Sequence, residues 1–209
     1  MEITPDMMKA AELYRILTGC VLPRPIAWVS SVADNGALNL APFSFFNVAS
    51  VKPPVLGFSP LVDEIRQDKD TLVNIRETGE FVVNIVSHKL AEKMNQTSAG
   101  YASDIDEFEC AGLAAVASAT VRPPGVAESL VRFECRLRQL ISFGSAPYAG
   151  SLILGDVCHI HVHQDIYSDG KIDADRLDAI GRLAGNFYAT TRDRFAIARP
   201  VIPGKQRLD

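Results

Sequence analysis

The fold is decided by residues 23–59, which read PRPIAWVSSVADNGALNLAPFSFFNVASVKPPVLGFS. The β-forming residues of 26–32 lead into the turn signal Asp34-Asn35-Gly36, and 37–46 returns as the partner strand. Pro53-Pro54 breaks the chain, and 55–59 then has the composition of a short buried strand. This stretch therefore predicts a β-hairpin followed by a third strand.

The predicted hairpin carries small polar side chains where a sheet usually carries Val or Ile. These side chains are Ser30, Ser31, Ser44, Asn47, Ser50 and Ser59, and the aromatic residues beside them are Trp28, Phe45 and Phe46. Ser30 and Ser31 are adjacent, so their side chains point to opposite faces of the strand. Uncharged donors next to aromatic rings suit a flat ligand with polar edges, and backbone N–H groups of a loop at 44–50 can bind an anion. The alternative is an ordinary half-buried hairpin whose serines face solvent.

Composition sets the class of protein. The 209 residues are 47% apolar and 22% charged, with a net charge of −4, which is typical of one globular domain spanning residues 1–209. The acidic balance argues against nucleic-acid binding, and no apolar run is long enough for a membrane helix. The first residues have no basic segment followed by an apolar one, so we expect no signal peptide. The four cysteines are far apart in sequence, and we expect reduced thiols in a cytoplasmic protein.

Outward from the hairpin, the chain alternates between helical and extended patterns. Helices are predicted at 6–18, 69–77, 87–94 and about 175–184. Further strands are predicted at 80–86, 130–143 and 152–163, the last two pairing as a hairpin through 144–150. Residues 100–129 are expected to be mostly irregular.

The strands are mostly neighbours in sequence, and helices do not alternate regularly with them. This order does not favour a doubly wound parallel sheet. We expect about six antiparallel strands closed into a barrel, because closure removes the exposed edges of a sheet.

A second anion site is predicted at Lys69-Asp70-Thr71. Asp70 or Thr71 can cap the helix that follows, whose first N–H groups lack intrahelical acceptors and carry partial positive charge. That end can hold a phosphate, with Arg66 or Lys69 adding charge. The alternative is an ordinary capped surface helix.

Three histidines, His159, His161 and His163, alternate along one predicted strand. Their side chains face the same side, about 6.6 Å apart per pair. His-x-His is a metal-ligand spacing, but histidines on a flat strand do not converge on one ion without a further ligand, and His88 is the one other histidine. We expect a polar strand face or an oligomer surface and no metal, with metal binding kept as a third hypothesis.

Sequence motifs of side-chain catalysis are absent. The chain has no Gly-x-Ser-x-Gly, Gly-x-Gly-x-x-Gly, Walker loop or His-Glu-x-x-His. An enzyme of this kind can still work if a cofactor carries the chemistry and the protein binds and orients it. We therefore predict no catalytic side chain.

Several segments together resemble the flavin reductase-like family, closest to its flavoredoxin-like branch. The segments are 23–31, 39–47, Pro53-Pro54, 69–75, 80–84, Met94-Asn95, 106–109, 111–113, 122–124, 127–129, 155–157 and 182–188. The resemblance covers nearly the whole chain. It implies a mainly β fold, an antiparallel Greek-key split β-barrel of about six strands with several flanking helices.

The same resemblance implies an FMN cofactor, in preference to FAD, bound near the interface of a homodimer. The residues that would line the ring and ribityl chain are Trp28, Val29, Ser30, Ser31, Ser44, Phe45, Phe46, Asn47 and Ser59. Lys69, Asp70 and Thr71 would hold the phosphate, and Asn95 would close the site. Gly185 and Tyr188 match a tail segment that covers the flavin or the nicotinamide.

One position departs from the family pattern. Many flavin reductases carry a histidine that contacts the nicotinamide at the place where this chain has Ser151. The resemblance thus implies hydride or electron transfer between NADH or NADPH and flavin, but Ser151 puts the nicotinamide step in question. The alternative is an FMN electron carrier that works with a redox partner protein or a monooxygenase.

Overall fold

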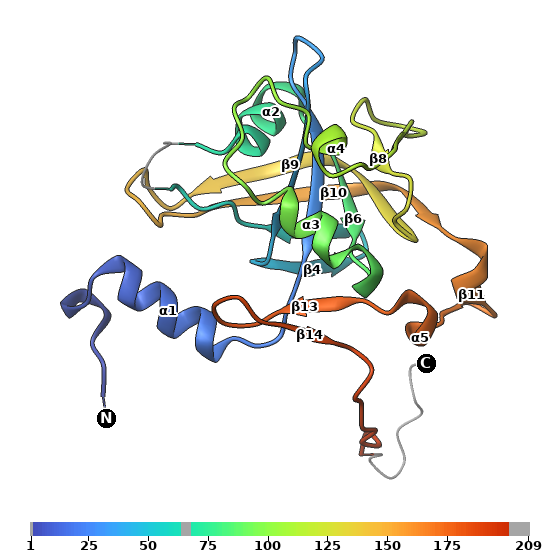
Figure 1. Ribbon diagram of the computed structural model, residues 1–209. Helices are drawn as coiled ribbons and strands as arrows, with labels where there is room; N and C mark the ends of the chain where they lie inside the picture. The colour runs from blue at the N-terminus through green and yellow to red at the C-terminus, as the bar shows by residue number, and fades with distance from the viewer. Residues whose placement is uncertain (1, 64–67, 201–209) are drawn as a thin grey trace.

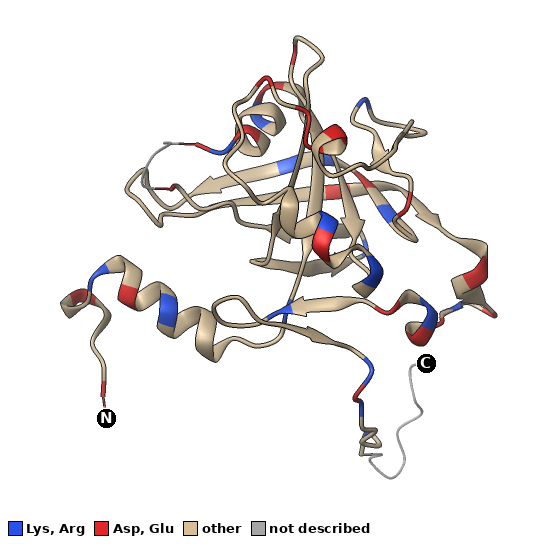
Figure 2. Ribbon diagram, viewed as in Figure 1, with Lys and Arg blue, Asp and Glu red and all other residues tan. Residues whose placement is uncertain are grey.

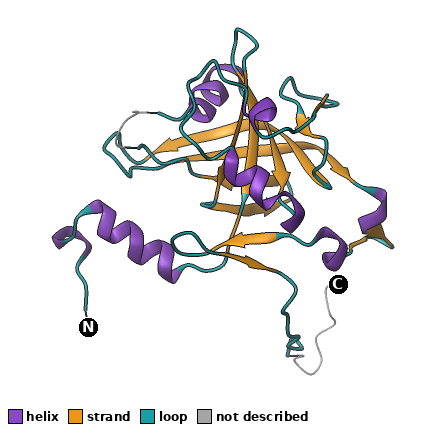
Figure 3. Cartoon of the chain, in the orientation of Figure 1, coloured by secondary structure: helices purple, strands orange, loops and turns teal. Residues whose placement is uncertain are grey.

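The computed structural model describes residues 2–63 and 68–200. Its described part has a large antiparallel sheet with helices packed around it (Figures 1 and 3). The strands of this sheet are β2 (Ala27–Val32), β3 (Leu38–Phe43), β4 (Phe46–Val51), β5 (Pro54–Phe58), β6 (Glu80–Ile85), β9 (Val131–Ser142) and β10 (Ser151–Val162). The order across the sheet is β3-β2-β6-β9-β10-β5-β4.

The edges of the sheet are β3 and β4, and no ladder joins these two strands within the described residues. The mainly β, antiparallel class is confirmed. The expectation of a fully closed barrel is wrong, because the chain passes from β3 to β4 through Ser44 and Phe45 and then pairs with β5 instead of β3. The sheet is therefore split between its two edge strands.

The remaining elements lie outside the large sheet. The helices are α1 (Ala10–Cys20), α2 (Asp70–Thr78), α3 (Ala91–Gln96), α4 (Glu107–Cys110) and α5 (Ala174–Leu177), with short 3-10 turns at Pro5–Met7, His88–Leu90 and Gln164–Ile166. The small strands are β1 (Arg24–Pro25), β7 (Ala115–Val116), β8 (Gly125–Val126), β11 (Tyr167–Ser168), β12 (Lys171–Ile172), β13 (Ile180–Arg182) and β14 (Tyr188–Thr190). Figure 1 shows α1 and the β13–β14 hairpin lying together below the sheet. In the described part of the chain, no helix combines the length and apolar character needed to cross a membrane.

Three predicted elements differ from the observed ones. The predicted strand 37–46 ends at Phe43, and most of residues 44–50, expected as a loop, belong to the edge strand β4 (Phe46–Val51). The predicted helix at 175–184 stops at Leu177, because Asp178 adopts a left-handed conformation (φ 45°), and the chain continues as β13. The N-terminal helix begins at Ala10, where the Glu12 carboxylate accepts the Lys9 N–H at 3.1 Å, and not after Pro5. The hairpin of β9 and β10 is confirmed.

Strand β2 is buried on both faces. Trp28 belongs to a core that includes Leu40, Met94 and Phe108, whereas Val29 belongs to a second core on the opposite face. Successive residues of a strand point to opposite sides, so one strand serves both cores. This explains why all six residues of β2 are buried.

The small polar residues of β2 connect it to its neighbours. The Ser31 hydroxyl accepts hydrogen bonds from Asn39 Nδ2 at 3.2 Å and from Asn74 Nδ2 at 3.1 Å. Asn39 Nδ2 also donates to Thr71 Oγ1 at 2.8 Å. All four side chains are buried, so this network ties β2 and β3 to the first turns of α2.

On the other face of β2, Ser30 has a different set of partners. Its hydroxyl donates to the Pro124 carbonyl at 2.6 Å and accepts from Asn84 Nδ2 at 3.3 Å. The Asn84 side chain also accepts from Val126 N–H at 2.8 Å. The two adjacent serines therefore face opposite sides, as the strand period predicts, and both are satisfied inside the protein.

Glu107, the first residue of α4, connects this helix to β3. It is 6% exposed, and its carboxylate accepts the Leu40 N–H at 3.0 Å. Burial raises the pKa of Glu107 above its ordinary value; the Leu40 N–H opposes this shift, and the carboxylates of Asp70 and Asp106 add to it. A carboxyl group with a raised pKa in the folded state stabilises the fold below its unfolded pKa, and that contribution is lost as the pH rises through the folded pKa.

We predict that Asn39→Ala lowers the free energy of unfolding by about 1–3 kcal/mol, because it removes the donor to the buried Thr71 hydroxyl and one of the two amide donors to the Ser31 hydroxyl. Urea denaturation measures this loss. The matched control is Asn186→Ala, since Asn186 is exposed and makes no described side-chain hydrogen bond; it is expected to change stability by less than about 0.5 kcal/mol. Equal stability of the two variants would contradict the role of the network.

We also predict that Glu107→Gln flattens the dependence of stability on pH. Gln keeps an acceptor for the Leu40 N–H but has no charge to bury, so the variant gains in Tm relative to wild type as the pH rises above about 4.5. Thermal unfolding measured from pH 4 to pH 8 tests this. A Tm difference that stays constant over that range, or grows towards acid pH, would show that Glu107 titrates normally.

Candidate functional site

Three cavities adjoin one another in the described part of the chain, and Pro42 of β3 lines all three. We call them the helix-start cavity (about 180 Å³), the aromatic cavity (about 540 Å³) and the arginine cavity (about 190 Å³). The aromatic cavity alone lies within the roughly 300–1,000 Å³ that small-molecule sites occupy. Ser44 joins the aromatic and arginine cavities, and Lys69 joins the aromatic and helix-start cavities. The three together form one candidate site.

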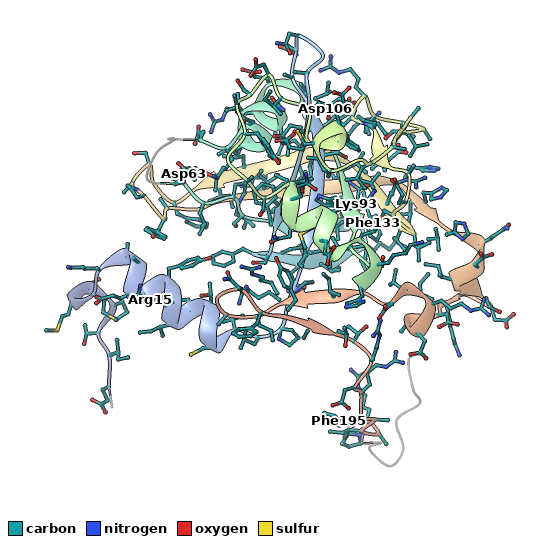
Figure 4. The ribbon with its side chains drawn as sticks, viewed as in Figure 1. Arg15, Asp63, Lys93, Asp106, Phe133 and Phe195 are labelled. Atoms are coloured by element: carbon teal, nitrogen blue, oxygen red, sulfur yellow. The ribbon has the colours of Figure 1, made fainter. Side chains whose placement is uncertain are left out.

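The helix-start cavity lies at the N-terminus of α2. The N–H groups of Leu72 and Val73 donate to the Lys69 carbonyl. The N–H of Thr71, one residue earlier, lies in the first turn and has no intrahelical acceptor. Lys69 Nζ pairs with Asp63 Oδ2 at 2.5 Å. Asp63, labelled in Figure 4, lies on the segment that precedes α2. Helix N–H groups and a lysine thus meet here, but a carboxylate already compensates the lysine.

The aromatic cavity is walled by rings from three separate parts of the chain. The Tyr14 ring of α1 stacks on Phe45 with centroids 6.4 Å apart and packs against Tyr148 at 5.6 Å. Ser44 and Ser59 add hydroxyl groups to the same wall. These groups suit a flat, polar-edged molecule.

Tyr148 is held in an unusual backbone conformation. Its φ is 69°, a left-handed value that is sterically costly for an aromatic residue. Hydrogen bonds with Val62 on both sides (Tyr148 N to Val62 O and Val62 N to Ala149 O, each 2.9 Å) hold the loop in place. Strained residues of this kind concentrate at functional sites.

The arginine cavity lies between α3 and the β13–β14 hairpin. The Tyr188 hydroxyl bonds Asn95 Oδ1 at 3.2 Å, and the Arg182 guanidinium lies 4.5 Å from the centre of the Tyr188 ring. Tyr14 reaches this cavity too, so α1 contributes to two of the three cavities.

The structure brings together about half of the residues predicted for the site. Those that line the three cavities are Ser44, Phe45, Ser59, Lys69, Asp70, Thr71, Asn95 and Tyr188. Phe46 and Asn47 line a neighbouring apolar cavity of about 450 Å³ with Leu17 and Val21. Ser151 is buried, and Gly185 lies on an exposed turn with a φ of 56°.

The side chains of Trp28, Val29, Ser30 and Ser31 lie in the interior and reach none of the three cavities. Trp28 still has a connection to the site, because its Nε1 donates to Thr97 Oγ1 at 2.9 Å. Thr97 lines the helix-start cavity. Strand β2 therefore contributes to the site by positioning other residues and not by lining the cavities.

Sequence reasoning missed several residues of the site, namely Tyr14, Pro42, Asp63, Glu107, Tyr148 and Arg182. Their clustering depends on the packing of segments far apart in sequence, and no local pattern marks it. Pro42 could have been predicted, since it lies in the hairpin strand that carries several of the predicted site residues. Arg66, the other cation considered for the phosphate, lies outside the described residues.

Two of the three alternating histidines lie opposite charged residues of β9. In the register of β9 and β10, His159 faces Glu134 and His161 faces Arg132. The pKa of His161 is lowered by partial burial, with Arg132 and the two neighbouring histidines acting in the same direction. No group of three His, Cys, Asp or Glu side chains suited to a metal is present among the described residues.

Known proteins share both the sequence and this architecture. Residues 18–176 match the model of the flavin reductase like domain. An uncharacterized protein of Halalkalibacterium halodurans, BH2278, is 40% identical over 204 residues, which cover 97% of this chain and 98% of the relative.

Two solved structures are also similar over almost their whole lengths. Nitrilotriacetate monooxygenase component B from Bacillus cereus has a TM-score of 0.89 and 36% identity, covering 94% of this chain and 98% of the other. The 2-nitrobenzoate 2-nitroreductase NbaA of Pseudomonas fluorescens has a TM-score of 0.86 and 30% identity, covering 96% of each chain. A Shewanella frigidimarina protein described as a flavin reductase with a split barrel domain, at 22% identity and a TM-score of 0.81, supports the fold alone; it covers 96% of this chain and all of that one. The chain belongs to the flavin reductase-like domain family, and its fold is the split barrel.

Proposed function

We propose that this protein binds FMN in the aromatic and helix-start cavities and transfers hydride or electrons between NADH or NADPH and the flavin. The observation that supports this most is the aromatic cavity beside the N-terminus of α2. The aromatic walls of Tyr14, Phe45 and Tyr148 fit a flat ring system, and the α2 N-terminus fits a phosphate. Family membership supports a flavin, and we propose FMN in preference to FAD, as the sequence resemblance implies.

When bound, the flavin supplies the hydride-transfer chemistry at its N5, so the protein needs no acid or base of its own. The work of the chain is to hold and orient the ring. The Ser44 and Ser59 hydroxyls offer hydrogen bonds to its polar edge, and Pro42 and Phe43 give an apolar wall. Asn95 and Tyr188, joined by a hydrogen bond, close the side next to β14.

A second candidate function is an FMN electron carrier of the flavoredoxin type. Ser151 supports it: the residue is 4% exposed, its N–H donates to the Pro60 carbonyl at 3.1 Å, and it lines none of the three cavities. Ser151 therefore offers no side chain to a nicotinamide. A carrier would receive its electrons from a protein donor.

A partner monooxygenase follows as a proposal from the likeness to a monooxygenase component B.

We also infer a homodimer. Its support is the exposure of large apolar side chains at the end of α1, Leu17 and Val21, and on β4, Val48 and Val51, the last being 84% exposed. We regard residues 1–209 as one domain, and we place it in the cytoplasm because all four cysteines are unpaired.

We predict that the purified protein keeps a yellow colour through gel filtration and that Lys69→Ala weakens FMN binding about tenfold. Removing the ammonium group takes away the one positive side chain at the described α2 N-terminus. Quenching of flavin fluorescence during titration measures the affinity. The control is Lys171→Ala, which removes an exposed lysine far along the sequence on β12; a wild-type protein that fails to bind added FMN would overturn the proposed function.

For the nicotinamide step, we predict that anaerobic mixing with NADH or NADPH bleaches the flavin absorbance within seconds, since a reductase reduces its flavin directly. Stopped-flow absorbance follows the change. Bleaching by dithionite but by neither nucleotide would reject the reductase and leave the electron carrier.

A further inference from the structure

Two arginines face each other across the small sheet next to the arginine cavity. Arg24 of β1 and Arg182 of β13 are register partners in an antiparallel pair. Like charges directly opposite one another destabilise a sheet. The pair therefore needs an explanation, and the surroundings of each guanidinium provide one.

Arg24 is a structural residue. It is 6% exposed and donates to the carbonyls of Thr18, Val21 and Leu183 at 2.7–3.0 Å and to the Ser44 hydroxyl at 3.3 Å. These acceptors are neutral, so within the described residues no carboxylate balances the charge of Arg24. Burial lowers the pKa of Arg24, and Arg182 contributes in the same direction, although Tyr14 opposes it.

Arg182, by contrast, has N–H donors that its described contacts do not use. A guanidinium has five N–H donors, and the described contacts of Arg182 are one hydrogen bond to the Gly185 carbonyl at 2.6 Å and the stacking on Tyr188. Within the described residues, no carboxylate lies within ion-pair distance of Arg182 and none lines the arginine cavity. The other donors near it in this cavity are uncharged, among them Ser44, Asn95 and Ser98.

This sets Arg182 apart from Lys69, the other cation of the described site, whose charge Asp63 already offsets. A half-buried guanidinium with open donors, placed opposite a second buried guanidinium, is an anion-binding arrangement. An anion there would make charge-assisted hydrogen bonds and also relieve the repulsion between the two arginines.

We propose that Arg182 is the specificity-determining residue that binds the anionic group of the second substrate, a planar ring compound bearing a carboxylate or a phosphate. The arginine cavity shares Tyr14, Pro42 and Ser44 with the aromatic cavity, so a compound whose anionic group binds Arg182 lies next to the space proposed for the flavin ring. This inference rests on the proposed function, because the compound is the one that exchanges electrons with the flavin. Arg24 fixes the backbone and Ser44 around it as a positioning residue.

The test measures equilibrium binding by calorimetry on the protein without flavin, before any turnover. Benzoate and its neutral analogue benzamide probe a carboxylate on a ring, and NADPH and NADH probe a phosphate on a nicotinamide. We expect Arg182→Gln to weaken benzoate or NADPH binding 10- to 100-fold and to leave benzamide within about twofold. Arg182→Lys should restore part of the loss, and FMN affinity should stay within about twofold.

The matched control is Arg15→Gln, which removes the same charge from the exposed face of α1, where Figure 4 labels Arg15. It should bind every probe as the wild type does. Thermal unfolding confirms that each variant is folded; if Arg182→Gln is not, Arg182→Lys is compared with wild type for a shift in the benzoate-to-benzamide ratio.

Three results would overturn the inference: unchanged binding of all four probes by Arg182→Gln, an equal loss for benzoate and benzamide, or a loss of FMN affinity as large as that of the anionic probes. The last result would assign the arginine to the phosphate of FMN. Failure of the wild type to bind FMN is a separate outcome that rejects the proposed function. An anion preference lost in Arg182→Gln would still show that the site binds anions.

Discussion

The buried hydrogen-bond network of Ser31, Asn39, Thr71 and Asn74 is the interaction on which the rest of the site depends. It joins two strands of the sheet to the first turns of α2, and it does so with polar atoms that are costly to leave unpaired in the interior. Because each of these side chains needs the others, the α2 N-terminus has one position against β3. The helix-start cavity, with Asn39 and Thr71 in its wall, follows from that position.

The charges of the site are arranged unevenly. The helix-start cavity carries three carboxylates, those of Asp63, Asp70 and Glu107, beside Lys69, while the described lining of the arginine cavity has a cation and no carboxylate. Elsewhere in Figure 2, Lys and Arg are interspersed with Asp and Glu along the ribbon, so the contrast is local. In the helix-start cavity an anionic ligand therefore meets a lysine whose charge is offset by carboxylates. In the arginine cavity it meets an arginine with no described carboxylate beside it.

The comparison of sequence with structure turns on burial. The serines of the hairpin stood out because they replace residues that pack well, and the interpretation that they do something other than packing holds. Ser44 and Ser59 face the aromatic cavity, but Ser30 and Ser31 bond inside the fold. The two-residue alternation of a strand predicts which serines share a face, but it does not predict what packs against that face. Residues 44–51 likewise have a strand composition that fits either a continuation of β3 or a new edge strand, and the pairing with β5 decided it.

What the sequence by itself determined is local: a hairpin after residue 26, whose second strand it extended to 46, a helix starting within one residue of Asp70, and the long hairpin of β9 and β10. It also supplied a set of motifs specific enough to identify the flavin reductase-like family. These depend on residues a few positions apart, whose spacing is readable. The tertiary structure alone decided that Tyr14, Phe45 and Tyr148 wall one cavity and that Arg24 faces Arg182. These groups come from segments separated by up to 158 positions, and the contacts arise when the sheet brings the segments together. The physical reason is that cavities and charge pairs depend on which surfaces pack against each other.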